Sequence, residues 1–339
     1  MGWVIVDALD TMMLMNLTDE VARARKWIVE SLNWDQDKEV SVFETTIRML
    51  GGLLSAHYLS GNDDVYLEKA VDLADRLLGA FESPTGIPFA SVNLKQRYGS
   101  QSHADGGSST TAEVSTLQLE FKYLAALTGE TLYWEKAERV MQALESNKAQ
   151  DGLVPIFVSP ETGHYTTQEI RLGSRGDSYY GIVSFTFPLI VEYLLKQYLQ
   201  TSKAEPIYRT MYDHAMGGVK RHLVGYSYPN HYTFIGELSQ GISSSTLSPK
   251  MDHLVCFLGG NFALGATEGK TLEQARLQGW TVRQQEDLDL AEAITRSCVE
   301  MYNITETGIA PEIVRFNTDT SKNDDITIKP NDRYHFSLK

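Results

Sequence analysis

A short pattern returns along the chain and limits the folds that the chain can adopt. Tyr66-Leu-Glu-Lys-Ala70 is echoed by Tyr133-Trp-Glu-Lys-Ala137 about 67 residues later, and Ile207-Tyr-Arg-Thr-Met-Tyr212 is a weaker third copy. Each copy opens an amphipathic helix, and further helical segments are predicted near 43–59, 112–127 and 194–200. We therefore predict an all-α chain whose repeating unit is a pair of helices with long connections.

Turn signals follow the helix pairs. They are Thr85-Gly-Ile-Pro88, Asp151-Gly-Leu-Val-Pro155 and Thr307-Gly-Ile-Ala-Pro311, in which Gly and Pro end helices and build turns. Each helix pair needs neighbours to cover its apolar face, and an open solenoid or a closed α/α barrel provides them. The long loops carry Trp, Tyr, His and acids, which favours the barrel because loops gathered at one mouth can form a pocket.

Two opposite charges occupy an otherwise apolar helical segment. Apolar residues of 43–54 recur at helical spacing, and Glu44 and Arg48, four residues apart, lie beside one another on an adjoining stripe. A buried pair of this kind often marks a functional site. An exposed pair is an ordinary surface ion pair that contributes on the order of tenths of a kcal/mol. The segment alone leaves both interpretations open.

Composition excludes several classes of function. The chain has 339 residues, 42% of them hydrophobic, so it can bury a large core as one big domain or two ordinary ones. Its net charge of -14 would repel a phosphate backbone, so we expect no nucleic acid partner and favour a neutral or cationic ligand. Residues 1–8 show no signal peptide, and the longest apolar run, 181–191, is too short to span a bilayer.

The cysteines and two glycosylation triplets bear on the compartment. Cys256 and Cys298 suit either one disulfide or two buried thiols. Asn16-Leu-Thr18 and Asn303-Ile-Thr305 are acceptors for N-glycosylation if the chain enters the secretory pathway, although such triplets often arise by chance.

Four further polar residues occupy positions at which a helical core would normally have apolar side chains: Glu113, Asp177, His253 and Glu312. Glu113 could cap the start of its helix, Asp177 could be an N-cap, and His253 could be a satisfied core histidine. Glu312 directly follows a proline and is well placed for a first helical turn. If one acid instead lies near the start of a helix in each helix pair, these acids would converge at one end of an α/α barrel. We then expect one cavity to be faced by five residues: Glu44, Glu113, Asp177, His253 and Glu312. At least one carboxyl should then have a raised pKa, because crowded like charges resist joint ionisation.

Several blocks, in order along nearly the whole chain, resemble the class I α-1,2-mannosidases, glycoside hydrolase family 47. They are Val6-Asp-Ala-Leu-Asp-Thr11, Phe43-Glu-Thr-Thr-Ile-Arg-Met-Leu-Gly-Gly52, Gly86-Ile-Pro88, Ala112-Glu-Val-Ser-Thr-Leu-Gln-Leu-Glu-Phe121, Gly176-Asp-Ser-Tyr-Tyr180, His253-Leu-Val-Cys-Phe257 and Pro311-Glu312. The resemblance implies an (α/α)7 barrel, a calcium ion at its base and inverting hydrolysis of terminal α-1,2-linked mannose from high-mannose N-glycans in the endoplasmic reticulum or Golgi. It also implies a disulfide between Cys256 and Cys298.

The resemblance further assigns roles to single residues. Glu44 matches the proton donor, which acts through a water, while Asp177 and Glu312 match further catalytic acids. Inversion needs one carboxyl group to protonate the leaving oxygen and another to activate water from the opposite face. The residues that match the sugar pocket are Arg48, Glu113 and His253, together with Arg175, which resembles the enzymes of the endoplasmic reticulum that remove one mannose from the nine-mannose glycan.

The chain also departs from the pattern of that family. The family continues past Asp332-Arg-Tyr-His335 into an Arg-Pro-Glu motif that holds the general base, and then to the Thr that binds calcium, whereas this chain stops at Lys339 and begins after the family's first helix. Residues 181–191 separate Tyr180 from a segment that the family joins to it directly, which is typical of an insertion. We therefore expect a single catalytic domain over 1–339, an incomplete barrel, no metal ligand within the chain, and an inactive chain as written.

Three functions of different class remain open from the sequence. The first is a processing glycosidase, monomeric and located in the secretory pathway. The second is a non-catalytic, lectin-like relative that binds mannose glycans in quality control, and the third is a helical-repeat scaffold without a sugar site. The joint presence of Glu44, Asp177 and Arg175 favours the first.

Overall fold

The computed structural model describes residues 2–103, 105–180, 193–244, 246–330 and 332. The described residues divide into two compact units, the first made of 2–148 and 157–166 and the second of 149–156, 167–180 and those from 193 onward. The predicted insertion at 181–191 lies outside the described residues, and the prediction of a single catalytic domain stays a prediction.

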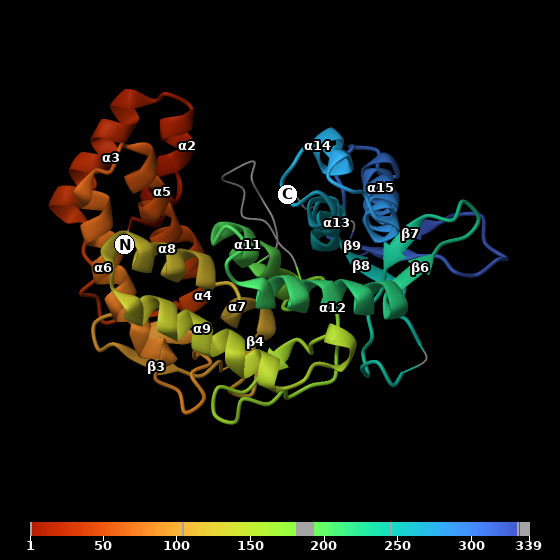
Figure 1. Cartoon of the computed structure of the whole chain (residues 1–339), viewed down its shortest axis with the longest axis horizontal. Coiled ribbons are helices and arrows are strands. Elements are labelled where there is room, and N and C mark those ends of the chain that lie inside the picture. Colours follow the sequence, from red (N-terminus) through yellow and green to blue (C-terminus); the bar gives the residue numbers. More distant parts are fainter. Residues whose placement is uncertain (1, 104, 181–192, 245, 331, 333–339) are drawn as a thin grey trace. The chain divides into compact units, whose positions relative to one another are not determined.

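The first unit is mainly helical (Figure 1). Its helices are α1 (Trp3–Asp7), α2 (Leu9–Leu14), α3 (Thr18–Ser31), α4 (Val42–Glu44), α5 (Gly51–Leu59), α6 (Asp64–Leu77), α7 (Thr111–Val114), α8 (Gln118–Thr128) and α9 (Thr131–Ser146), with a π-helical segment at Thr45–Leu50 and a 3₁₀ segment at Leu78–Phe81. Short strands β1 (Glu39–Ser41), β2 (Ser91–Asn93) and β3 (Tyr98–Ser100) form one antiparallel sheet, and β4 (Ser109–Thr110) pairs with β5 (Phe157–Val158).

The second unit contains the remaining described elements. Its helices are α10 (Asp177–Tyr180), α11 (Tyr193–Gln200), α12 (Pro206–His222), α13 (Leu258–Thr267), α14 (Leu272–Leu277) and α15 (Val282–Asn303), with 3₁₀ segments at Gln150–Gly152 and His253–Phe257. Strands β6 (Val224–Tyr226) and β7 (Thr233–Ile235) form a hairpin, and β8 (Lys250–Asp252), β9 (Ile313–Phe316) and β10 (Ile326–Thr327) form an antiparallel sheet of order β10-β9-β8.

Helix pairs recur as the sequence predicted. α5 packs against α6, α8 against α9, α11 against α12 and α13 against α15 (Figure 1). The three copies of the repeated pattern lie in the first turns of α6, α9 and α12, the second helix of each of three pairs. Tyr66, Tyr133 and Tyr208 are at most 2% exposed, so the pattern repeats because each helix puts a large aromatic ring into the core at the same place.

The three predicted turn signals also have a common structural basis. Gly86, Gly152 and Gly308 have φ of +85°, +75° and +68°, in the left-handed region that favours glycine. Because α9 and α15 end at Ser146 and Asn303, before these glycines, Gly152 and Gly308 do not cap the helices but redirect the chain in the connections that follow.

The short strands and the π-helical segment were not predicted. Strands of two to four residues give too short an alternation to stand out beside helical periodicity. The expectation that Glu312 lies in a first helical turn was wrong. Glu312 directly precedes β9, where Val314 and Phe316 are buried and the strand pairs with β8 and β10, so sheet pairing decides the conformation there.

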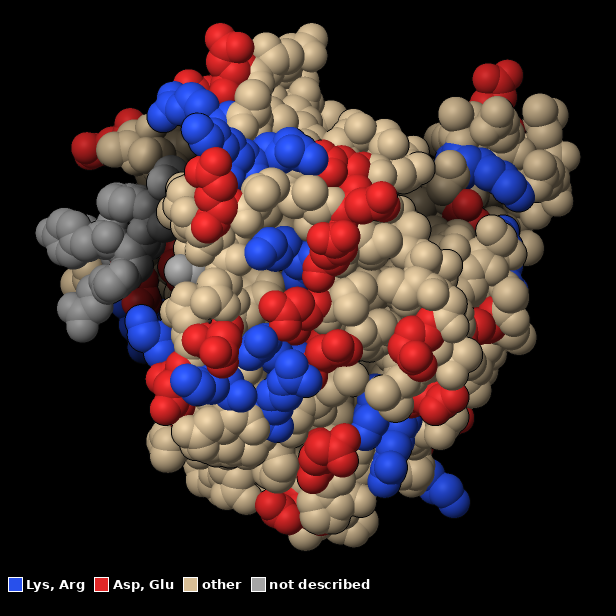
Figure 2. All heavy atoms as spheres, turned by 90° about the vertical axis from the view of Figure 1, so that its left-hand side faces the viewer, with Lys and Arg blue, Asp and Glu red and all other residues tan. Residues whose placement is uncertain are grey.

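No helix within the described residues is long and apolar enough to cross a membrane. On the face shown in Figure 2, Lys and Arg side chains lie interspersed with Asp and Glu. The predicted absence of a nucleic acid partner stays a prediction.

Candidate functional site

Glu44 and Arg48 form the ion pair that their spacing predicted. Ser41 caps the helix by accepting the backbone N–H of Glu44 at 3.2 Å, and Arg48 lies in the following π-helical segment. The Nε of Arg48 donates to Oε2 of Glu44 at 2.6 Å, and its Nη1 lies 3.5 Å from Oδ2 of Asp7. These carboxylates raise the pKa of Arg48, with the Glu44 hydrogen bond as the main cause. The Arg48 guanidinium is therefore shared between the carboxylates of Glu44 and Asp7.

This pair is half-exposed rather than buried. The side chains of Arg48 and Glu44 are 40% and 42% exposed. The pair therefore lacks the burial that would most directly have indicated a functional site. Backbone geometry nevertheless holds the group in place. A Cβ at Gly52 would lie 2.8 Å from the carbonyl oxygen of Val6, so only glycine lets α5 approach α1 closely enough for Asp7 to reach Arg48. Single π-helical turns of this kind are frequent at functional sites.

Glu113 lies in the same unit, one turn into α7. Its backbone N–H is accepted by the side chain of Thr110 at 3.1 Å, so its segment is a capped helix start, as the structural interpretation expected. Burial is the largest cause that raises the pKa of Glu113, and the charges of Asp105 and Glu44 raise it further against the Thr110 hydrogen bonds. The predicted raised carboxyl pKa is thus confirmed in direction, although burial contributes more than like charge.

Asp177 and Arg175 lie in a turn of the second unit. Asp177 is the first residue of α10, and its Oδ1 accepts the N–H of Ser178 at 2.8 Å. Arg175 has φ of +74°, a left-handed conformation that costs a non-glycine residue on the order of 1 kcal/mol and is found mainly where the surroundings enforce it. A Cβ at Gly176 would lie 2.2 Å from the carbonyl oxygen of Arg171, so the turn is closely packed on its own backbone.

Asp252 ties this turn to strand β8. Its Oδ2 accepts the backbone N–H of Ser174 at 3.1 Å, and a Cβ at Gly173 would lie 2.2 Å from that same oxygen. The Nζ of Lys250 lies 3.0 Å from Oδ1 of Asp252 and 2.9 Å from Oε1 of Glu237. All three side chains are buried or nearly so, and burial raises the pKa of Glu237 although Lys250 opposes it. Asp252 is in turn the residue before His253.

His253 and Glu312 meet through their backbones. The N–H of His253 donates to the carbonyl oxygen of Glu312 at 2.8 Å, next to the pairing of β8 with β9. The His253 ring is 5% exposed, and its Nε2 lies 2.8 Å from the hydroxyl of Tyr302 in α15. This is the satisfied core histidine of the structural interpretation, and a role in sugar binding stays a prediction.

The predicted disulfide is present. Cys256 and Cys298 are bonded, with their Cα atoms 5.7 Å apart. This separation satisfies the limit of about 7 Å that a disulfide requires. The bond joins the His253–Phe257 segment to α15, which also carries Tyr302, so two links fix His253 against that helix.

The predicted site residues thus fall into two groups. The first unit brings together Glu44, Arg48 and Glu113, and the second brings together Arg175, Asp177, His253 and Glu312. The prediction that five of these residues face one cavity spans both units and stays a prediction.

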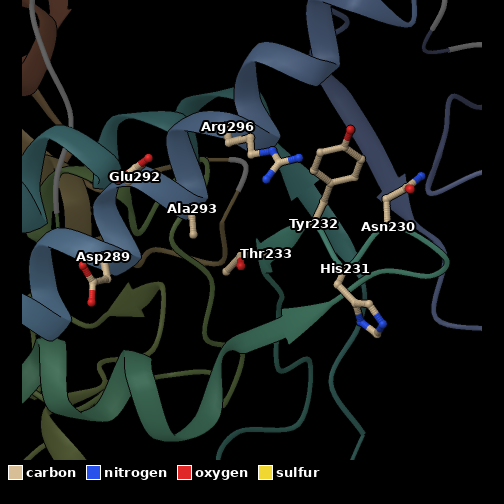
Figure 3. Close-up of a pocket in the computed structure, with 8 residues that line it drawn as sticks. All are labelled: Asn230, His231, Tyr232, Thr233, Asp289, Glu292, Ala293 and Arg296. Carbon is tan, nitrogen blue, oxygen red and sulfur yellow. The ribbon is translucent and has the colours of Figure 1, made fainter.

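Two further pockets lie away from these residues. One in the second unit, about 340 Å³, lies between the β6–β7 hairpin and α15, with the Arg296 guanidinium over the Tyr232 ring (Figure 3). The other, about 350 Å³ in the first unit, is lined by residues that include Arg139, Asn147 and His164. None of the predicted site residues lines either pocket.

No group of three or more His, Cys, Asp or Glu side chains within the described ranges could hold a metal ion. Calcium is also bound by backbone carbonyl and water oxygens, so a calcium site stays a prediction from the family resemblance, and we derive no chemical step through it.

Four residues of these groups were not predicted: Asp7, Asp252, Glu237 and Lys250. Asp7 lies in the family-like block Val6–Thr11, and Asp252 directly precedes the block that begins at His253. These positions could have indicated both residues from the sequence. Glu237 stands in no such block, and only the fold brings it to Lys250.

Comparisons with known proteins agree with the resemblance. The family model described as glycosyl hydrolase family 47 matches residues 1–337. A mannosyl-oligosaccharide 1,2-α-mannosidase of Candida albicans is 57% identical over 337 residues, covering 99% of this chain and 57% of the relative. An endoplasmic reticulum mannosyl-oligosaccharide 1,2-α-mannosidase of Saccharomyces cerevisiae is 47% identical over 365 residues, covering 99% and 64%. The chain thus spans about six tenths of the length of these curated relatives.

A solved structure supports the fold. The α-1,2-mannosidase from Trichoderma reesei matches with a TM-score of 0.77 and 28% identity, over 93% of this chain and 62% of that one. The match confirms the predicted fold class, the helix-pair fold of that family.

Proposed function

This chain belongs to glycosyl hydrolase family 47, and on that premise we propose that it carries the acid-bearing part of an inverting α-1,2-mannosidase. The substrate class is terminal α-1,2-linked mannose on high-mannose N-glycans. The observation that carries the proposal is the group of Glu44, Arg48 and Glu113, held by a capped helix start, a π-helical turn and a close glycine contact. A scaffold without a sugar site would have no use for this arrangement.

In the proposed reaction, Glu44 delivers a proton through a water to the glycosidic oxygen as the bond to C1 breaks. Arg48 holds the Glu44 carboxylate in one orientation, because it is itself fixed between Glu44 and Asp7. Burial raises the pKa of Glu113, and its carboxyl is assigned to hydrogen bonding with a sugar hydroxyl.

On the other side of the reaction, inversion requires a water that attacks C1 from the opposite face. The resemblance places the general base for this water in the family's Arg-Pro-Glu motif, so we assign Asp177 and Glu312 as further catalytic acids, and Arg175 and His253 to sugar binding. The turn at 173–177, packed on Asp252, gives Asp177 and Arg175 a fixed backbone.

The compartment and the metal are also proposals. Relatives from two yeasts are named as endoplasmic reticulum enzymes, which supports a location in the secretory pathway. The disulfide is consistent with the oxidising conditions of that pathway. Calcium dependence is proposed on the family resemblance alone. Loss of mannose release on chelation, with recovery on adding calcium back, would test it.

The test uses a hybrid in which residues 1–337 replace the matched segment of the Candida albicans relative, made with and without 181–191. We expect release of mannose from a nine-mannose N-glycan. Glu44→Gln and Asp177→Asn should each lower kcat by on the order of 10²-fold or more, the usual scale for loss of acid or base assistance. Glu20→Gln, in an exposed pair with Arg23, and Asp64→Asn, in the first turn of α6, are matched controls that should not change kcat.

The outcomes separate the classes of function. A hybrid that binds the nine-mannose glycan without releasing mannose would support the lectin-like alternative. A hybrid that neither binds nor hydrolyses the glycan would contradict the family role. The unaltered 339-residue chain, assayed in parallel, tests the expectation that it is inactive alone.

A further inference from the structure

We propose that Asn16 carries an N-linked glycan in the folded protein, and that the second acceptor triplet, at Asn303, does not. The inference rests on the secretory location in the proposed function, but it does not depend on catalysis. The two triplets, Asn-Leu-Thr and Asn-Ile-Thr, match the acceptor pattern equally well. A difference in their glycosylation would therefore come from the structure.

The Asn16 triplet is presented at the tip of a turn. Asn16 has φ of +58° between α2 and α3, and Asn16, Leu17 and Thr18 are all exposed. Neither the amide of Asn16 nor the hydroxyl of Thr18 makes a hydrogen bond with another described residue. Both groups that define the acceptor are therefore open to a transferase.

The surroundings of Asn16 supply a second, independent observation. Leu14, Met15 and Leu17 are 56%, 64% and 41% exposed and form an apolar patch around the turn. Exposed apolar side chains that adjoin one another need a cover, and a bulky, solubilising glycan attached at their centre can provide one.

The Asn303 triplet differs in that its polar groups are engaged in hydrogen bonds, although Asn303 and Ile304 are themselves exposed. Asn303 is the last residue of α15, and its amide donates to the carboxylate of Glu300 at 3.3 Å. The hydroxyl of Thr305 has one proton to donate and lies within hydrogen-bonding distance of two carbonyl oxygens, that of Tyr302 at 2.9 Å and that of Ile309 at 3.1 Å. Because the triplet rule requires a hydroxyl at the third position, a hydroxyl whose proton is already engaged is a poor acceptor signal once the segment has folded.

The modification balances with one co-reactant, a lipid-diphosphate-linked oligosaccharide. The amide nitrogen of Asn16 forms a bond to the anomeric carbon of the first sugar. The bond from that carbon to the phosphate oxygen breaks, the lipid diphosphate leaves with the electron pair, and one amide proton passes to a base of the transferase.

The experiment secretes the 339-residue chain from a eukaryotic host behind an added signal peptide, which enforces entry into the pathway. Peptide mass spectrometry before and after endoglycosidase treatment then measures the occupancy of each triplet. We expect one occupied site, lost in Asn16→Gln and in Thr18→Ala and retained in Thr18→Ser, whereas Asn303→Gln should change nothing.

A Cys298→Ala variant tests why Asn303 is spared. Cys298 lies in α15, five residues before Asn303, and loss of its disulfide should keep the end of that helix unfolded for longer. Occupancy of Asn303 should then rise. Mass spectrometry reads glycans on misfolded chains as well, so poor folding of a variant does not hide the result.

Absence of a glycan from Asn16 in the secreted wild-type chain would overturn the proposal, and so would equal occupancy of Asn16 and Asn303. Failure of the glycosidase test with Asn16 occupied would count against the proposed catalysis alone, because the host supplies the transferase.

Discussion

Asp252 accepts a hydrogen bond from the backbone N–H of Ser174 at 3.1 Å, so that strand β8 holds the turn that carries Arg175 and Asp177. The same carboxylate pairs with Lys250 on its other oxygen, and Lys250 in turn pairs with Glu237. Asp252 therefore connects a buried charge cluster to a loop whose residues we assign to sugar binding and catalysis.

Removal of this connection should destabilise the fold. Asp252→Ala leaves the Ser174 N–H without its acceptor and gives the buried Lys250 one partner fewer, and each such loss is worth about 1–3 kcal/mol. Urea denaturation should show the loss as a lower midpoint with an unchanged slope. Asp64→Ala, at an exposed helix start, is the matched control and should change stability by less than about 1 kcal/mol. An unchanged midpoint for Asp252→Ala would mean that the turn is held by other contacts.

Gly173 and Asp252 should be energetically coupled. A Cβ at Gly173 would lie 2.2 Å from Oδ2 of Asp252, so Gly173→Ala forces the carboxylate away from Ser174. In a double-mutant cycle, Gly173→Ala should therefore cost less in the Asp252→Ala background, with a coupling on the order of 1 kcal/mol. Simple additivity of the two unfolding free energies would show that the clash is relieved elsewhere.

Loss of the disulfide should also lower the stability of the fold. Cys256 and Cys298 are 42 residues apart, and closing a loop of that length in the unfolded chain corresponds to about 4 kcal/mol in the chain-entropy model. Cys298→Ala should thus lower the urea midpoint strongly, and the wild-type protein under reducing conditions should approach the same midpoint. Persistence of the wild-type midpoint in both cases would contradict a structural role for this bond.

Much of the fold was predictable from sequence because it rests on local periodicity. Tyr66, Tyr133 and Tyr208 mark equivalent places in three helix pairs, and glycines such as Gly86 mark turns that need a positive φ. Glu312 shows the limit of this reasoning. A residue after proline suits a helix start equally well, and only the long-range pairing of β9 with β8 decides otherwise.

The candidate site was predictable in its members but not in their linkage. The spacing of Glu44 and Arg48 predicted their contact, and it exists. The connection from Asp252 to Ser174 joins residues 78 apart, and no local pattern carries such information. The exposure of Glu44 and Arg48 could not be predicted either, because a helix stripe that adjoins the apolar stripe can be either buried or exposed.

The raised pKa of Glu113 predicts a specific pH dependence. A carboxyl whose folded-state pKa lies above its unfolded value binds more protons in the folded state, so its contribution to stability falls as pH rises from about 4.5 through the folded pKa. Glu113→Gln removes this contribution, so the free energy of unfolding of the variant minus that of wild type should increase as pH rises over that interval, because only wild type loses stability there. Glu20→Gln, in an exposed pair on α3, controls for the loss of one charge. A difference between Glu113→Gln and wild type that stays constant with pH would contradict the raised pKa.

Arg48 distinguishes a surface ion pair from a functional one. Its side chain is 40% exposed, and exposed pairs contribute about 0–1 kcal/mol, so Arg48→Gln should leave the thermal midpoint of the chain within a few degrees of wild type. In the hybrid enzyme the same change should lower kcat/KM by on the order of 10²-fold, because Glu44 loses the group that orients it. Arg23→Gln, which breaks the exposed pair with Glu20, should leave both quantities unchanged. If Arg48→Gln behaved like Arg23→Gln in both measurements, the pair would be an ordinary surface ion pair. A large loss of stability with little loss of activity would instead make it a structural contact between α1 and the π-helical segment.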